Sequence, residues 1–144
     1  MNSLDTNILF YSLNEDCPEH AACQALVGKA LVSPHEWIVA DQAWFELYRL
    51  LRNRQILSQP LSASEAAEKV DWFRRHSGWA RCAWEPFLME KLKPLWAAES
   101  FPARRTFDLI LALTLKTQGV TEFFTRNTRD FEGYGFFTVT NPLE

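Results

Sequence analysis

A chain of 144 residues, 47% hydrophobic and 23% charged, has the composition of a folded globular protein and is long enough to bury a core. Its formal net charge of −3 argues against a protein that coats nucleic acid by bulk electrostatic attraction, but it does not exclude an enzyme acting on nucleic acid. Three cysteines without a Cys-x-x-Cys pair argue against a disulfide framework, and the sequence shows neither a signal peptide nor a membrane span, so we expect a soluble, cytoplasmic protein.

Strands and helices alternate along the predicted chain. In chain order we expect strand 2–4, helix 7–13, helix 19–32, strand 37–40, helix 42–52, helix 62–76, strand 79–84, helix 86–99, helix 107–117, strand 121–126 and strand 136–140. Asp41 is placed to cap the helix that follows it, and Ser62 with Glu65 forms a capping-box pattern. Pro86 suits the first turn of a helix.

This alternation indicates an α/β fold in which helices cover both faces of a central parallel sheet. The four apolar residues 37–40 are typical of a strand that is buried on both faces. The sequence contains no internal repeat and no linker rich in Gly or Ser, so we expect residues 1–144 to form one domain.

Four acidic residues stand beside the carboxyl ends of the predicted strands, where ligands bind in open parallel sheets. Asp5 directly follows the first strand, and Glu46 lies in the first turns of the helix after the second strand. Asp108 begins a strongly apolar helix, and Asp130 lies in the turn after strand 121–126. We therefore predict that these four acids, although distant in sequence, meet at one edge of the sheet.

Each acid taken alone also has a purely structural interpretation. Asp5 could cap a helix, Asp108 could complement a helix dipole, and Asp130 could serve a turn. Glu46 could be a solvated charge on a helix surface. Taken together, however, Asp108 in an apolar segment and Glu46 between two apolar neighbours are costly to ionise unless something compensates their charge.

A divalent cation would supply that compensation. Two like charges about 4 Å apart repel by roughly 4 kcal/mol at an effective dielectric constant near 20. Ligation by carboxylate oxygens alone favours Mg²⁺ or Mn²⁺ over zinc, which prefers His and Cys. Such an ion can acidify a water molecule and neutralise charge on a phosphodiester.

The motifs that carry these acids occur in the order found in PIN-domain proteins. They are residues 4–9 (Leu-Asp-Thr-Asn-Ile-Leu), Glu46 in its helix, residues 107–112 (Phe-Asp-Leu-Ile-Leu-Ala) and residues 125–131 (Thr-Arg-Asn-Thr-Arg-Asp-Phe). The closing segment 139–142 (Val-Thr-Asn-Pro) is similar to the tail of the VapC-like toxins of that family. The chain thus resembles the PIN-domain family from end to end.

This resemblance implies a Rossmann-like three-layer α/β/α sandwich and an endoribonuclease dependent on Mg²⁺ or Mn²⁺. It also implies the toxin of a toxin–antitoxin pair, with an antitoxin protein as partner and homodimers as a frequent state. Asp5, Glu46, Asp108 and Asp130 match the acidic quartet of the family. Residues 53–106 match no specific family motif.

Three further polar residues match positions that support the quartet. Thr6 and Thr125 correspond to the polar neighbours that steady the first and fourth acids. Asn127 stands where many relatives carry another Asp, a substitution that weakens a second metal position, and it would contribute a hydrogen bond. The first strand also departs from the family, since Asn2 and Ser3 replace part of an apolar run.

Arginines near the acids are candidates for contacts with RNA phosphates. The four candidates are Arg104, Arg105, Arg126 and Arg129. The alternative is that they are solvated or paired with the acids. The six tryptophans likewise could stack bases, although such residues more often lie in a core or an interface.

Two other functions remain open. The first is a PIN-like RNA- or protein-binding module that has lost turnover, which the intact quartet disfavours and the substitution at Asn127 leaves open. The second is a phosphatase-type enzyme with Asp5 as nucleophile. That enzyme class usually carries a second Asp two residues later, where this chain has Asn7.

Overall fold

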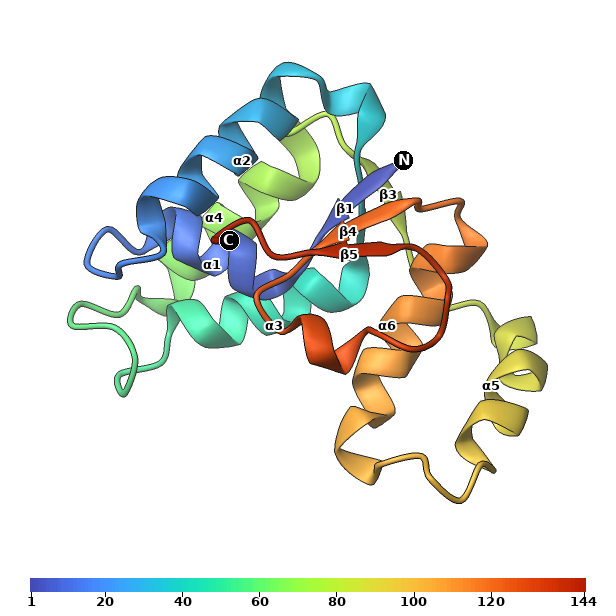
Figure 1. The fold of residues 1–144 in the computed structure, drawn as a ribbon. Helices are drawn as coiled ribbons and strands as arrows, with labels where there is room; N and C mark the ends of the chain where they lie inside the picture. Colours follow the sequence, from blue (N-terminus) through green and yellow to red (C-terminus); the bar gives the residue numbers. More distant parts are fainter.

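Five short parallel strands form the centre of the structure, a computed structural model that describes residues 1–144 (Figure 1). They are β1 (Asn2–Leu4), β2 (Ile38–Ala40), β3 (Ala80–Cys82), β4 (Glu122–Phe124) and β5 (Thr138–Thr140). One ladder has the order β1-β4-β5 and the other pairs β2 with β3. A parallel bridge between Asn2 and Trp37 joins the two ladders, which gives the order β3-β2-β1-β4-β5.

Six α-helices surround this sheet. They are α1 (Thr6–Leu13), α2 (His20–Val32), α3 (Asp41–Leu51), α4 (Ala63–His76), α5 (Met89–Trp96) and α6 (Thr106–Thr117). Short 3₁₀ turns occupy residues such as Ala103–Arg105, just before α6, and Thr128–Asp130, after β4. None of the helices combines the length and the apolar content that crossing a lipid bilayer requires.

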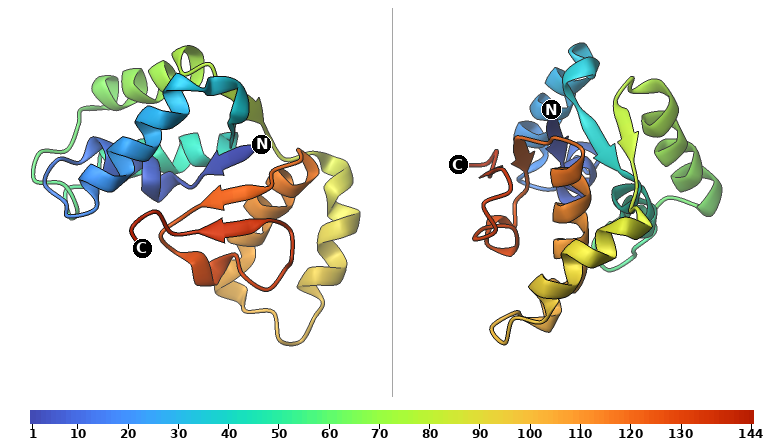
Figure 2. Two further views of the ribbon diagram at one scale, coloured as in Figure 1. Left: turned by 45° about the horizontal axis from the view of Figure 1, so that its top comes forward. Right: turned by 90° about the vertical axis from the view of Figure 1, so that its right-hand side faces the viewer.

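Alternate strand residues feed two separate cores, as the period of two in a β-strand requires. Leu4 and Val39 pack with α1, α2, α3 and α4 on one face of the sheet. Ile38, Ala40 and Phe123 pack with α6 on the other face, and α5 packs against the outside of α6. Figure 2 shows the blue-to-green helices on one side of the strands and the yellow and orange helices on the other. The predicted three-layer α/β/α fold with a parallel sheet is therefore confirmed.

The capping box predicted at the start of α4 is present. Ser62 accepts a hydrogen bond from the backbone N–H of Glu65 at 3.2 Å, and the Glu65 carboxylate accepts one from the N–H of Ser62 at 3.1 Å. Gly78, after the end of this helix, has a φ of 79°. A Cβ atom there would lie 2.9 Å from Pro34, so only glycine fits.

Some predicted boundaries are wrong. Asp41 does not cap α3 but is its first residue, because the chain already turns into the helix at Ala40. The segment 79–84 contributes only the strand Ala80–Cys82. Trp79 lies outside this strand. Its indole is buried and donates a hydrogen bond to the backbone carbonyl of Ala30 in α2 at 3.0 Å.

The segment 86–99 was predicted as one helix and is divided in the structure. A 3₁₀ turn at Pro86–Leu88 leads into α5, which contains Pro94 and ends at Trp96. Proline supplies no N–H for the helix ladder, so a helix continuing past it is weakened. The polar first strand has no such explanation, because Ser3 is fully buried and its hydroxyl has no hydrogen-bond partner.

Candidate active site

The strand order reverses at β1, which has β2 on one side and β4 on the other. In doubly wound sheets a crevice opens at such a point, outside the carboxyl ends of the strands. Asp5 is the residue after β1 and Thr125 is the residue after β4. The backbone N–H of Asp5 donates to the carbonyl of Phe124 at 2.9 Å, which holds the two strand ends together.

Asp5 is a buried carboxylate with local and distant partners. Its Oδ1 accepts a hydrogen bond from the backbone N–H of Thr6 at 2.7 Å, so Asp5 caps α1. Its Oδ2 accepts the hydroxyl of Thr125 at 2.6 Å. The pKa of Asp5 is raised from 3.8 to about 6, mainly by burial and to a smaller extent by the charges of Glu46 and Asp108. The two hydrogen bonds act in the opposite direction but do not offset the burial.

Glu46 approaches this carboxylate from α3. Its Oε2 accepts the hydroxyl of Thr6 at 3.0 Å, and the side chain is half-buried. Thr6 therefore serves two acids, Asp5 through its backbone and Glu46 through its side chain. The predicted pairing of threonines with acids is wrong in part, since Thr125 steadies Asp5 rather than Asp130.

Asp108 stands on the third residue of α6, on the other side of the crevice. Its pKa is raised from 3.8 to about 6, mainly by burial and then by the charges of Asp130 and Glu46. Arg105 and Arg104 partly counter that rise. Asp108 is thus an electrostatic neighbour of Asp130, of Glu46 and of Asp5.

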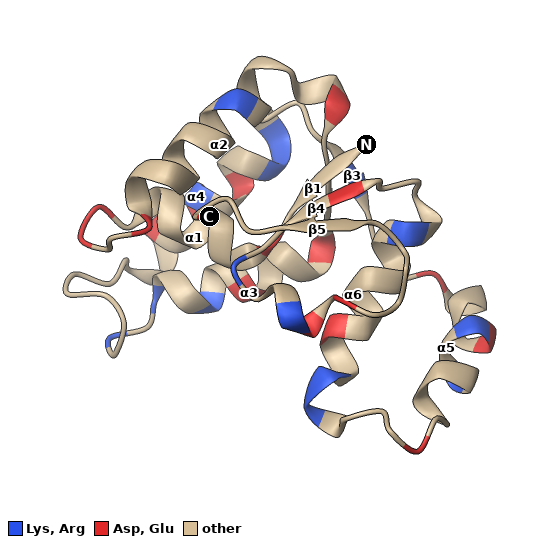
Figure 3. Ribbon diagram, viewed as in Figure 1, with Lys and Arg blue, Asp and Glu red and all other residues tan.

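Asp130 ends the 3₁₀ turn after β4 and is paired with an arginine. Nη1 of Arg104 lies 2.9 Å from its Oδ1. Nε of Arg105 donates to the backbone carbonyl of Asp130 at 3.0 Å, and the guanidinium lies over the ring of Tyr134, 4.9 Å from its centroid. Figure 3 shows red segments on α3, on α6 and in the loop after β4, and a blue segment at the start of α6.

Electrostatic coupling connects the four acids, but their side chains do not form a metal cage. No group of three or more His, Cys, Asp and Glu side chains has an arrangement that could hold a metal ion. Asp130 in particular is turned to Arg104. The donor set nevertheless fits a hard cation, because it consists of carboxylate oxygens. In addition, burial disfavours the negatively charged forms of Asp5 and Asp108, and a bound cation would compensate these charges.

Asn7 belongs to the site although its role was not predicted. Its Nδ2 lies 3.4 Å from both the Asp5 Oδ2 and the Thr125 hydroxyl, and its Oδ1 accepts the backbone N–H of Arg126 at 3.4 Å. The sequence signal for this role was its position two residues after Asp5, as the second residue of α1. Asn127 contributes its backbone N–H, which donates to the Thr125 hydroxyl at 3.0 Å.

Three of the four arginines predicted to contact RNA have partners within the chain. Arg104 and Arg105 hold the Asp130 turn. Arg126 donates to the hydroxyl of Tyr11 at 3.2 Å and lies 3.5 Å from Glu19. Arg129 is exposed and makes no ion pair. Arg129 could therefore contact a phosphate without breaking an ion pair within the chain.

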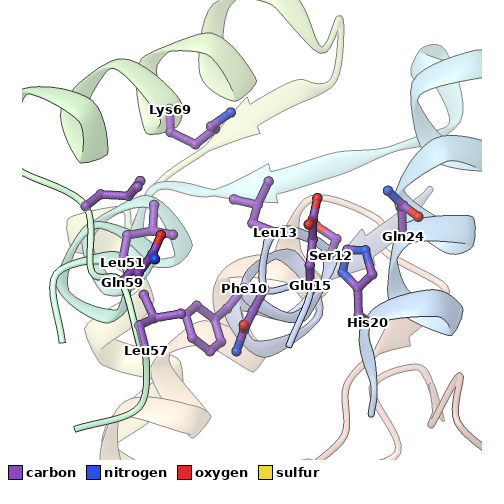
Figure 4. A pocket seen from close by; sticks show the side chains of 12 residues that line it. Phe10, Ser12, Leu13, Glu15, His20, Gln24, Leu51, Leu57, Gln59 and Lys69 are labelled. Carbon is purple, nitrogen blue, oxygen red and sulfur yellow. The ribbon is translucent and has the colours of Figure 1, made fainter. Parts of the chain in front are cut away.

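A separate cavity of about 370 Å³ lies at the other end of α1 (Figure 4). Its wall includes Phe10, Leu57, His20, Glu15 and Lys69, with the hydrophobic residues on one side and His20 and Gln24 on another. None of the four acids lines it. The candidate site is instead the region at the carboxyl ends of β1 and β4 where the four acids are electrostatic neighbours, which we call the acidic crevice.

The PIN domain family model matches residues 3–136 of this chain. The sequence is 43% identical over 147 residues to Ribonuclease VapC24 of Mycobacterium tuberculosis (strain ATCC 25618 / H37Rv), covering 99% of this chain and 97% of that protein. The chain belongs to the PIN domain family. PIN domain ribonucleases generally depend on a divalent metal ion, which agrees with the donor chemistry of the crevice.

Solved structures share the PIN fold at low sequence identity. VapBC2 from Rickettsia felis, bound to a DNA fragment from its promoter, has a TM-score of 0.67 and 15% identity and covers 97% of each chain. A toxin–antitoxin complex from Klebsiella pneumoniae has a TM-score of 0.60 and 20% identity, covering 99% of this chain and 98% of that one. At these identities the likeness establishes the fold of this PIN domain.

Proposed function

We propose that this protein is an endoribonuclease that hydrolyses RNA phosphodiester bonds in the acidic crevice, and that it is the toxin of a toxin–antitoxin pair. The observation that supports the proposal is the electrostatic coupling of Asp5, Glu46, Asp108 and Asp130, which come from four separate segments, with the pKa of Asp5 and of Asp108 raised to about 6. The 43% identity to Ribonuclease VapC24 over nearly the whole chain supports this activity.

The proposed cofactor is Mg²⁺ or Mn²⁺. Asp5, Asp108 and Asp130 would hold the ion directly, and Glu46 would hold it directly or through a water. When bound, the ion supplies a more acidic water molecule and a positive charge beside the phosphodiester. Binding requires the Asp130 carboxylate to leave Arg104, whose side chain is 73% exposed and therefore free to move.

The residues of the chain have distinct tasks in this scheme. Thr125 and the N–H of Thr6 fix the orientation of Asp5, and the Thr6 hydroxyl fixes Glu46. Glu46, held by the Thr6 hydroxyl, would orient the attacking water. Arg104, once released from Asp130, would become available to an RNA phosphate, as would Arg129.

The proposed partners are an antitoxin protein and a second copy of the chain. The similarity to VapC24 and to the toxin–antitoxin complex from Klebsiella pneumoniae supports an antitoxin that blocks the crevice. A protein of this kind would act in the cytoplasm, where its RNA substrate and its antitoxin are made.

Incubation of purified protein with cellular RNA and Mn²⁺ tests the proposal. Cleavage should appear with Mn²⁺, disappear with EDTA and return when excess Mn²⁺ is restored. The matched control is the Asp108→Asn variant, prepared in parallel, which excludes a contaminating nuclease. Cleavage that persists in EDTA, or that is equal in the variant, would contradict the proposed function. A protein that binds RNA but never cleaves it would instead support the binding-module alternative.

A further inference from the structure

An apolar groove of about 490 Å³ runs beside the acidic crevice, between α3 and α6. We call it the aromatic groove and define it by Phe45, Phe107, Trp84, Gln42, Asp41 and Glu46. Phe45 is 71% exposed and Phe107 is 69% exposed, which is unusual for rings of this size. Each of them immediately precedes an acid of the site, Glu46 and Asp108 respectively.

The groove is continuous with the candidate active site. Glu46 lines the groove and also accepts the hydroxyl of Thr6, which belongs to the crevice. Its two walls are tied together, because the Gln42 side chain on α3 donates to the backbone carbonyl of Phe107 on α6 at 3.2 Å. A substrate whose phosphate lay among the acids would therefore have its adjacent groups at the mouth of this groove.

The charge of the groove indicates which part of a substrate it can take. Its lining includes two carboxylates, Asp41 and Glu46, and no Lys, Arg or His. Phosphate groups would be repelled there, whereas the cations near the crevice, Arg104 and Arg105, lie on the Asp130 side. A neutral, flat and partly apolar group suits exposed aromatic rings, and a nucleobase is such a group.

We propose that the aromatic groove binds one unpaired base of the RNA substrate next to the scissile phosphate, with Phe45 and Phe107 as stacking surfaces. This inference rests on the proposed ribonuclease function and adds to it a subsite for one unpaired base. A base held inside a duplex is stacked on its neighbours and cannot enter the groove, so fully paired RNA is a poor substrate.

The test measures RNA binding without cleavage. Asp5→Asn protein is mixed with a short single-stranded RNA that carries a fluorescent purine analogue, and with the same RNA annealed to its complement. In this Asp5→Asn background, a second substitution, Phe45→Ala or Phe107→Ala, should weaken binding of the single-stranded RNA by about 5-fold to 100-fold. It should also remove the fluorescence quenching that stacking of the purine analogue causes. Phe45→Trp should preserve both, and Phe87→Ala, which removes a 56% exposed ring outside the groove, should change neither.

Equal affinity in all variants would overturn the inference. It would also be overturned if the phenylalanine variants bound RNA normally but changed the molar mass in light scattering or lost the antitoxin, because the groove would then be a protein interface. Circular dichroism confirms that each variant is folded. Failure of the ribonuclease function itself is seen separately, as a wild-type protein that does not cleave RNA with Mn²⁺.

Discussion

Asp5 and Glu65 both use a carboxylate at the start of a helix, and their properties are opposite. Asp5 caps α1 and accepts the backbone N–H of Thr6, while Glu65 completes the capping box of α4. Burial raises the pKa of Asp5 to about 6, whereas the hydrogen bonds from Ser62 lower the pKa of the exposed Glu65. A carboxylate at a helix start is therefore exposed in one place and buried beside other acids in the other.

The difference between the two carboxylates lies in what surrounds them. Glu65 has only its own helix start and solvent, so its charged form is favoured. Asp5 lies between two strand ends, with Glu46 and Asp108 as electrostatic neighbours, so its charged form is disfavoured until a cation or a proton compensates it. A carboxylate at a helix start thus indicates a functional site only when tertiary contacts bury it among other acids.

The largest expected effect is on catalysis, where Asp5→Asn should reduce the rate strongly and Glu65→Gln should not. Asp5→Asn keeps a good helix cap but removes the charge, so RNA cleavage with Mn²⁺ should fall by more than about a hundredfold, since even residues that merely support a metal ligand cost up to that much. Glu65→Gln should leave the rate unchanged. Initial rates of cleavage measure both, and retained activity in Asp5→Asn would remove Asp5 from the proposed machinery.

The same pair should respond oppositely to pH in metal-free protein. A pKa raised on folding means that the folded chain binds the proton more tightly, so Asp5 costs stability at pH 7 and this cost disappears as the pH falls from about 6 to 3.8. Asp5→Asn should therefore raise the free energy of unfolding by about 2–3 kcal/mol at pH 7, and by little near pH 4.

Glu65→Gln should show the reverse sign. The lowered pKa of Glu65 gives stability that is present at pH 7 and is lost as the pH falls through its folded value. Urea unfolding in EDTA at several pH values measures both differences. If the difference in the free energy of unfolding between wild type and Asp5→Asn were the same at every pH, the pKa of Asp5 would not change on folding. The contrast between the two carboxylates would then be removed.

Thr125→Val tests the contact that most distinguishes Asp5 from Glu65. The Thr125 hydroxyl donates to Asp5 at 2.6 Å and lowers its pKa, so valine should raise that pKa further and move the acidic limb of the cleavage profile to higher pH. The rate at neutral pH should fall about tenfold or more. Thr138→Val, on the exposed side of β5, is the matched control. An unchanged pH profile would show that the hydroxyl does not tune Asp5.

Ser62→Ala should have the smallest effect and only on stability. It removes the hydroxyl that accepts the N–H of Glu65, so the free energy of unfolding should fall by about 1 kcal/mol. The rate of RNA cleavage should stay the same, because α4 contributes no acid to the crevice. Thermal unfolding and the cleavage assay measure the two effects, and a loss of activity without unfolding would connect α4 to the site.

Local patterns were sufficient to predict most elements of secondary structure. Alternation of strands and helices requires a parallel sheet, and in such a sheet the residues after the strands gather at one edge. Asp5 and Asp130 could therefore be placed at that edge before any coordinates. The Ser62 capping box could also be predicted, because all its bonds lie within four residues.

The sequence by itself determined the order of elements and the burial of Ile38–Ala40 on both faces, because these follow from side-chain periodicity and from hydrogen bonds between near neighbours. Only the tertiary structure decided that Thr125 serves Asp5 across 120 positions, that Arg104 holds Asp130, and that two phenylalanines stay exposed beside the acids. Burial, pKa and long-range pairing depend on which segments pack together, and no local pattern records that packing.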